Sequence, residues 1–171
     1  MKKLPHESWA NWYDFVYENT YGSLYGRLGK VQLQLIKELI SPGSQIIEYG
    51  AGTGRLSLPL AEESYEVIAV ERSSGMLEQL ETKADLAGLN IKGYHTTIEG
   101  FKGDAADLAL AVFTVITYTI DDNSMCKSIQ NIAQYLKSGG LFLFDLPSTA
   151  FFEQEELFDH RSKELNRRVS M

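Results

Sequence analysis

The 171-residue sequence has few of the residues that build disulfides or metal sites. Its single cysteine, Cys126, excludes an internal disulfide and a cysteine-rich zinc site. The three histidines, His6, His95 and His160, show no metal-ligand spacing, so we expect no metal. The 16 basic residues form no stripe and are outnumbered by 23 acidic ones, which gives a formal charge of −7. Nucleic acid is therefore disfavoured as a partner, because binding its phosphates requires clustered Lys and Arg.

Long hydrophobic runs are also missing. No apolar stretch approaches the roughly 20 residues that a bilayer span needs, and the start MKKLPHESW has no apolar core of a signal peptide. We therefore expect a cytoplasmic protein without membrane insertion. What the chain does have is 44% hydrophobic and 11% aromatic residues, enough for the core of one domain.

Short apolar runs alternate with helical segments along most of the chain. Two N-terminal helical segments up to residue 40 precede the alternation, and Ser73-Ser74 and Gly88 are expected to bound one of the later helices. We expect strands at residues 45–49, 65–71, 91–95, 107–113 and 141–145, and helices at residues 55–62, 75–87 and 124–136. This order predicts an α/β protein: a Rossmann-like three-layer fold with a mainly parallel sheet of about five strands.

The first expected strand ends in a glycine-rich loop. Gly50, Gly52 and Gly54 alternate after an apolar run, and glycine lets the backbone approach a ligand closely. A tight turn without a ligand is the simpler reading of these glycines alone. The dinucleotide motif G-x-G-x-x-G would require a third glycine where Arg55 stands, which disfavours a nicotinamide cofactor.

Two acids narrow the choice of ligand. Glu48 precedes the glycines and favours a cationic ligand, whereas Glu71, at the end of the second expected strand, can accept hydrogen bonds from both ribose hydroxyls. A ligand with a ribose, a positive charge and no phosphate is S-adenosyl-L-methionine.

Four ordered motifs within residues 45–146 resemble class I S-adenosylmethionine-dependent methyltransferases. They are Glu48-Tyr49-Gly50-Ala51-Gly52-Thr53-Gly54, Val70-Glu71-Arg72-Ser73-Ser74-Gly75-Met76-Leu77, Asp107-Leu108-Ala109-Leu110-Ala111-Val112-Phe113 and Leu136-Lys137-Ser138-Gly139-Gly140-Leu141. The resemblance implies a site in which one acid holds the ribose, apolar side chains border the adenine, and backbone carbonyls receive the methionine ammonium. The implied cofactor-binding residues are Glu48, Tyr49, Gly50, Ala51, Gly52, Glu71, Arg72, Met76, Thr97, Ile98, Val112 and Phe113. Thr97 stands where similar enzymes often have an Asp.

The sequence does not select a catalytic residue. The segment Phe113-Thr114-Val115-Ile116-Thr117-Tyr118 lacks the Asn/Asp-Pro-Pro-aromatic signature of similar enzymes that methylate nucleobase amines, so we expect a small-molecule acceptor. Candidate bases are His95, Asp145, Tyr118 and an N-terminal tyrosine. Tyr13, Tyr17 and Tyr21 follow one helical face and belong either to the pocket or to the core.

Residues 1–171 are expected to form a single domain: a helical cap (1–40), a cofactor-binding core (45–146) and an incomplete C-terminal segment (147–171). The family usually adds a sixth and a seventh strand, so the fifth would be an exposed edge. Residues 151–171, a second copy in a homodimer, or sequence missing from a fragment are the alternatives for covering it. The main alternative function is accordingly a truncated or non-catalytic S-adenosylmethionine-binding subunit that needs a partner; an NAD-binding oxidoreductase is the lesser one.

Overall fold

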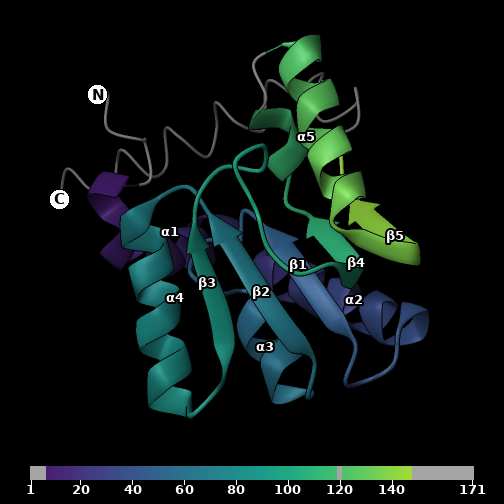
Figure 1. The fold of residues 1–171 in the computed structure, drawn as a ribbon. Coiled ribbons are helices and arrows are strands. Elements are labelled where there is room, and N and C mark those ends of the chain that lie inside the picture. Colours follow the sequence, from purple (N-terminus) through teal and green to yellow (C-terminus); the bar gives the residue numbers. More distant parts are fainter. Residues whose placement is uncertain (1–6, 119–120, 148–171) are drawn as a thin grey trace, which may run out of the picture.

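The structure, a computed structural model, describes residues 7–118 and 121–147. Its centre is one sheet of five parallel strands in the order β3-β2-β1-β4-β5 (Figure 1). The strands are β1 (Gln45–Tyr49), β2 (Glu66–Glu71), β3 (Ile91–His95), β4 (Ala106–Ala111) and β5 (Leu136–Phe144). The chain adds β2 and β3 on one side of β1 and then returns to add β4 and β5 on the other.

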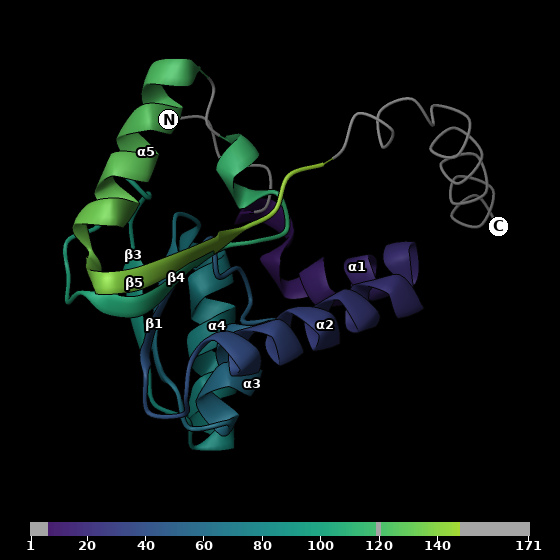
Figure 2. The ribbon, with the colours of Figure 1, turned by 90° about the vertical axis from the view of Figure 1, so that its right-hand side faces the viewer.

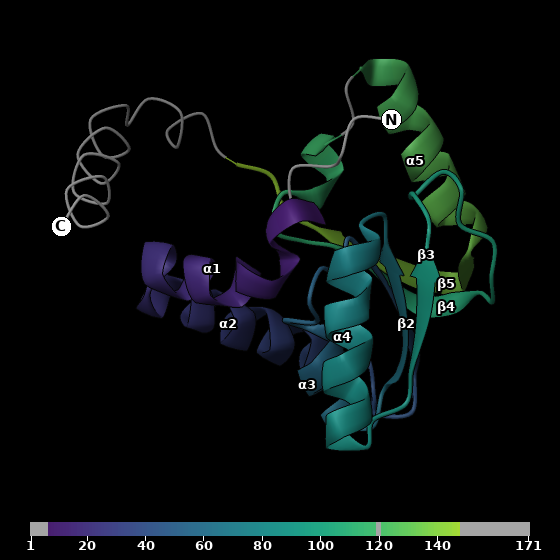
Figure 3. The ribbon, with the colours of Figure 1, turned by 90° about the vertical axis from the view of Figure 1, so that its left-hand side faces the viewer.

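Helices cover both faces of this sheet. Figures 2 and 3 show α2, α3 and α4 on one face and α5 on the other. The helical elements are η1 (Glu7–Trp12), α1 (Tyr13–Tyr21), α2 (Ser23–Leu39), α3 (Ser57–Glu62), α4 (Ser74–Ala87), η2 (Val115–Tyr118) and α5 (Asp122–Gln134). The three-layer Rossmann-like fold is thereby confirmed. No described helix is long and apolar enough to cross a membrane.

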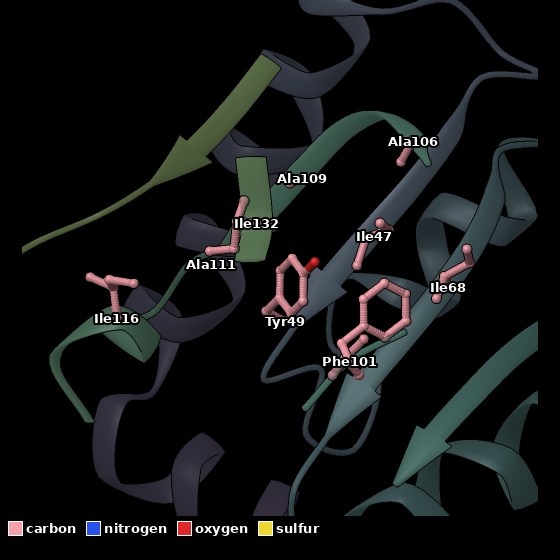
Figure 4. Packing of buried hydrophobic residues seen from close by; sticks show 10 residues of the cluster. Ile47, Tyr49, Ile68, Phe101, Ala106, Ala109, Ala111, Ile116 and Ile132 are labelled. Carbon is pink, nitrogen blue, oxygen red and sulfur yellow. The ribbon is translucent and has the colours of Figure 1, made fainter. Parts of the chain in front are cut away.

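Alternation along β1 divides its side chains between two cores. Ile46 packs with Ile36 of α2 and Leu60 of α3, whereas Ile47 packs on the opposite face with Ile132 of α5. Figure 4 shows the cluster that contains Ile47 and Ile132. Phe101 belongs to this cluster and packs on the face of the sheet that α5 covers. Because successive side chains of a strand point to opposite faces, neighbouring residues of β1 contribute to different cores.

Local signals predicted α4 well. Ser73 caps the helix, since its hydroxyl accepts a hydrogen bond from the Met76 N–H at 3.3 Å. At the other end Gly88 takes a left-handed conformation with φ 66° and terminates the helix. The strand expected at residues 91–95 is also present, as β3, with the same bounds.

The structure corrects three boundaries near the site. The helix expected from residue 55 begins two residues later, at Ser57. The strand expected at residues 107–113 ends at Ala111, because Phe113 and Thr114 take positive φ values of 63° and 62° that no strand accommodates. Residues 137–140, between the expected helix (124–136) and the expected strand (141–145), instead form a bulge inside β5, between the pairs Ala106–Leu136 and Leu108–Leu141.

The two N-terminal helical segments expected from the sequence are present, with η1 and α1 forming what we call the N-terminal arm (Glu7–Tyr21). The arm packs against α4 mainly through polar side chains. The Glu7 carboxylate accepts hydrogen bonds from the hydroxyls of Ser73 and Ser74, both at 2.6 Å. Asp14 pairs with Lys83, and its other oxygen accepts a bond from the Thr53 hydroxyl at 2.5 Å. The expected C-terminal segment, 147–171, lies outside the described residues from residue 148 onward.

Candidate functional site

A cavity of about 270 Å³ opens at the carboxyl ends of the strands. It lies where the chain order reverses between β1 and β4, the position at which open parallel sheets bind ligands. Both polar and apolar side chains line it. All residues that the sequence predicted for the cofactor site line this cavity, apart from Tyr49. The structure therefore brings together residues that are spread over more than sixty positions of the chain.

The glycine loop forms the floor of the cavity. Gly52 has φ 57°, and a Cβ built on it would meet nothing closer than the Met76 Cε at 3.7 Å. A side chain at this position would therefore project into the space that a ligand could fill. The glycine thus leaves a cradle at the point where the loop faces Met76.

Glu71 fixes this loop from the end of β2. Its Oε2 accepts a hydrogen bond from the Gly52 N–H at 2.9 Å, and its Oε1 accepts one from the Ser73 N–H at 2.8 Å. The side chain is 8% exposed and lines the cavity. Each carboxylate oxygen can accept more than one hydrogen bond, so the two backbone bonds leave acceptor capacity for ribose hydroxyls.

Glu48 is the most deeply buried acid of the cavity, at 4% exposure. It points to the face covered by α3, where its Oε2 accepts a hydrogen bond from the Ser57 hydroxyl at 2.5 Å. Burial raises the pKa of Glu48 to about 7, against the opposing effects of the Ser57 hydroxyl and the Arg55 charge. A cation bound nearby would favour the ionised form.

Met76, Thr97 and Ile98 form a second wall, and the exposed Arg72 lies at its rim. The Thr97 hydroxyl accepts a hydrogen bond from the Gly100 N–H at 3.2 Å and so shapes its own loop. The Arg72 guanidinium lies 5.1 Å from the centre of the Tyr118 ring, which joins this wall to the opposite one.

Val112 and Phe113 form the wall that follows β4. The N–H of Phe113 does not face a ligand, because it donates to the Asp145 Oδ2 at 2.7 Å. Asp145, a candidate base in the sequence, does not line the cavity but supports this wall from behind. His95 is also directed elsewhere, with its Nε2 at 3.1 Å from the carbonyl oxygen of Arg72.

Tyr49 departs from the predicted site. Its side chain is fully buried in the core beneath α5, where its ring lies 5.7 Å from that of Phe101 (Figure 4). The reason is strand alternation: Glu48 faces the opposite side of the sheet. Among the described residues, the Tyr49 hydroxyl has no hydrogen-bond partner, and burial raises its pKa.

The cavity also contains residues that the predicted set did not include. Most come from the arm, the glycine loop and the segment after β4, and the others from β2, the segment after β3 and α5: Tyr13, Thr53, Arg55, Val70, Thr96, Glu99, Val115, Tyr118 and Ser124. The sequence indicated two of them: Tyr13 shares one helical face with Tyr17 and Tyr21, and Tyr118 was a candidate base. Val115 and Ser124 had no such signal, because their place depends on how the segment after β4 turns. No cluster of His, Cys, Asp or Glu within residues 7–118 and 121–147 could hold a metal ion.

A parallel sheet with alternate glycines after its central strand and an acid at the end of the next one is typical of a class I, Rossmann-like S-adenosylmethionine-dependent methyltransferase, which is the class of this chain. Comparison with known proteins gives the same class. The model of the methyltransferase-domain family matches residues 46–140, so the chain belongs to that family.

Individual relatives support this assignment. A provisionally named methyltransferase of Geobacillus sp. (strain WCH70) is 27% identical over 170 residues, which cover 95% of this chain and 67% of the relative. The ubiquinone biosynthesis O-methyltransferase of Ruegeria sp. (strain TM1040) is 35% identical over 101 residues, covering 58% of this chain and 39% of that protein.

Solved structures show the same fold. The S-adenosylmethionine-dependent methyltransferase from Clostridium acetobutylicum ATCC 824 superposes with a TM-score of 0.69 at 23% identity, over 81% of this chain and 57% of that one. The chain thus spans between 39% and 67% of the length of these three relatives.

Proposed function

We propose that this chain binds S-adenosyl-L-methionine and transfers its methyl group to a small-molecule acceptor. The observation that carries the proposal is Glu71, whose buried carboxylate lies in the cavity while it holds the glycine loop through Gly52. In this arrangement Glu71 would accept the ribose hydrogen bonds directly beside the backbone cradle at Gly52. Family membership supports the reaction, since matching relatives are named as methyltransferases.

The residues present fit this cofactor chemically. Glu71 would hold the ribose, Met76 and Ile98 would enclose the adenine, and Glu48 would face the positively charged end. When bound, the cofactor supplies an activated methyl group on a sulfonium. The part of the protein is then to position two reactants in line and to exclude water, which requires no elaborate catalytic group.

The cavity and the charge of the chain favour a small acceptor. A space of about 270 Å³ lies just below the usual range of about 300–1,000 Å³ for ligand pockets, and the chain carries a formal charge of −7. Tyr13 and Tyr118 line the cavity from two sides and are the candidates for accepting or relaying a proton from the acceptor. The Ruegeria relative is named as an O-methyltransferase, which makes a hydroxyl group a reasonable first acceptor to test.

Calorimetry with S-adenosylmethionine and S-adenosylhomocysteine tests the cofactor. We expect both to bind and NAD to give no heat of binding. Replacing Glu71 by Ala removes the ribose acceptor and should weaken binding by about 1–3 kcal/mol. Glu66→Ala is the matched control, because Glu66 is an exposed acid at the opposite end of the same strand. Equal affinities of Glu71→Ala and the wild type would remove Glu71 from the site, and binding of NAD alone would overturn the proposed cofactor.

The acceptor class is tested by following S-adenosylhomocysteine production with separated cell fractions. Low-molecular-weight metabolites should support turnover, whereas purified RNA, DNA and proteins should not. Turnover with a nucleic acid fraction alone would contradict the small-molecule acceptor. A chain that binds the cofactor but turns over with no fraction would support the non-catalytic alternative.

A further inference from the structure

Two consecutive residues after β4 have an unusual backbone. Phe113 has φ 63° and Thr114 has φ 62°, although neither is glycine and Thr is β-branched. Left-handed conformations of such residues are strained and persist only where surrounding contacts enforce them. The segment after β4 therefore needs a support, and its strain marks a place where position is important.

The support comes from the end of β5. The Oδ2 of Asp145 accepts a hydrogen bond from the Phe113 N–H at 2.7 Å, and its Oδ1 accepts one from the Thr114 N–H at 2.5 Å. Consecutive N–H groups that point the same way form a concave binding site for an anion. Here the anion is a side chain of the protein itself, so both backbone donors are satisfied by one carboxylate.

Further contacts connect Asp145 to the glycine loop. Gln32 of α2 donates from its Nε2 to the Asp145 Oδ2 at 3.3 Å, and its Oε1 accepts a bond from the Arg55 Nη1 at 2.8 Å. The Arg55 guanidinium in turn lies 5.2 Å from the centre of the Phe113 ring. Gln32 is 7% exposed, whereas Asp145, Arg55 and Phe113 are half-buried, so the network is partly shielded from water. Three elements thus hold one short segment.

This segment shapes the cavity. Phe113 and Val115 both line it, and Val115 lies so close to the glycine loop that a Cβ on Gly50 would be 2.5 Å from the Val115 Cγ2. A shift of the segment would therefore change the space between the glycine loop and the β4 wall. Asp145 itself stays outside the cavity and acts through the backbone of residues 113 and 114.

We propose that Asp145 is a positioning residue, which holds Phe113 and Thr114 in their left-handed conformation and thereby sets the methionine and acceptor end of the cavity. The inference rests on the proposed function, since it assigns that end of the cavity to the methionine portion. The adenosine end, formed by Glu71 and Ile98, has no direct hydrogen bond with Asp145 among the described residues. Removing the Asp145 carboxylate should then weaken binding of the methionine portion of the ligand and leave binding of the adenosine portion unchanged.

Two ligands separate these ends: S-adenosylhomocysteine, which carries the amino acid portion, and adenosine, which lacks it. We expect Asp145→Ala to weaken S-adenosylhomocysteine binding about tenfold and to change adenosine binding less than about twofold. Asp145→Asn keeps one acceptor oxygen and should give an intermediate loss; it also serves if the Ala variant does not fold. Unchanged S-adenosylhomocysteine affinity, or an equal loss for both ligands in a folded variant, would overturn the proposal.

A second substitution tests the backbone strain itself. Glycine adopts positive φ without strain, so Thr114→Gly should recover at least threefold of the affinity that Asp145→Ala loses. Absence of any rescue would mean that Asp145 does not act through the conformation of Thr114.

Amide hydrogen exchange tests, without any ligand, whether Asp145 holds the backbone of Phe113 and Thr114. The amides of Phe113 and Thr114 should exchange markedly faster in Asp145→Ala, while the amides of β1 and β2 should stay protected. If the wild-type chain binds neither ligand, the proposed function fails, and exchange still shows whether Asp145 holds the segment. Unchanged exchange at both amides would refute the positioning role in either case.

Discussion

The N-terminal arm and the sheet are held in place by different interactions. The central strands bury Ile46, Ile47, Leu108 and Leu110 completely, whereas α1 has no buried residue in the described structure. The arm is attached by hydrogen bonds, ion pairs and stacked rings at its surface. Apolar burial couples the sheet into one cooperative unit, but surface contacts of this kind can open locally. The arm should therefore detach from the cavity without unfolding the sheet.

The aromatic side chains add a second attachment for the arm. Tyr13 and Tyr17 stack with ring centres 4.2 Å apart, and Tyr17 and Tyr21 approach Phe113 edge-on at 5.6 Å and 6.1 Å. These rings connect the arm to the β4 wall, while its carboxylates connect it to α4. The arm consequently contacts both walls of the cavity, and its detachment would open the site.

The largest expected loss of stability comes from a substitution in the core of the sheet. Leu110→Ala creates a cavity in a fully buried position of β4 and should lower the free energy of unfolding by about 2–5 kcal/mol. Leu86→Ala is the control, because this leucine is 85% exposed on α4 and its truncation should change stability by less than about 0.5 kcal/mol. Urea titrations followed by far-ultraviolet circular dichroism measure both. Similar losses in the two variants would mean that burial does not distinguish these positions.

A smaller, pH-dependent effect is expected from Glu48. Its pKa of about 7 in the folded chain lies above the ordinary value of 4.5, so unfolding releases a proton between these pH values. Stability should accordingly fall as the pH rises from 4.5 to 7, by something on the order of 3 kcal/mol, and level off above that. Glu48→Gln cannot ionise and should lose this part of the pH dependence, as measured by urea titrations across the range. A parallel pH profile in both proteins would show that other groups cause the change.

Replacing Glu7 should have the smallest effect on the stability of the whole fold, but it should clearly weaken the attachment of the arm. Both tryptophans of the chain, Trp9 and Trp12, lie in the arm, so tryptophan fluorescence reports the arm alone. Glu7→Ala should shift the fluorescence transition to lower urea and leave the dichroism transition unchanged. Glu18→Ala, an exposed acid of the same arm, is the control.

The charge of Glu7 makes its contribution depend on pH. The hydroxyls of Ser73 and Ser74 lower the pKa of Glu7 to about 2, so its carboxylate contributes fully above pH 4.5. That contribution should be lost as the pH falls through about 2. A fluorescence transition that coincides with the dichroism transition in wild type and in Glu7→Ala would contradict an independently detaching arm.

Local sequence patterns predicted one half of the site well. The glycine loop, Glu71 and the capped start of α4 depend on residues close together in the chain, and their conformations follow from glycine, an acid and a serine cap. The fold class could be predicted because strand and helix periodicities alternate along most of the chain, although no helix separates β3 from β4. Tyr49 was placed in the site because neighbouring positions of a motif were treated alike, whereas alternation sends its side chain into the core.

The other half depends on contacts between distant segments. Asp145 is 32 residues from Phe113, and Glu7 is 66 residues from Ser73. No periodicity predicts that a carboxylate after β5 will hold two left-handed residues after β4, or that the arm will turn toward α4. The predicted end of β4 was wrong for the same reason. Its apolar sequence predicts a strand up to residue 113, and nothing near it in the sequence indicates the hydrogen bonds that the Phe113 and Thr114 N–H groups donate to Asp145.

The close approach of Gly50 and Val115 restricts how this site can diversify. An alanine at position 50 would collide with Val115 as well as strain the backbone, so a larger residue there requires a smaller one at position 115. Gly50 in the glycine loop and Val115 at the start of η2 both line the cavity. Enzyme variants selected for a bulkier acceptor should therefore change at residue 115 first, and a library that randomises it with residue 50 held as glycine would retain the most folded members.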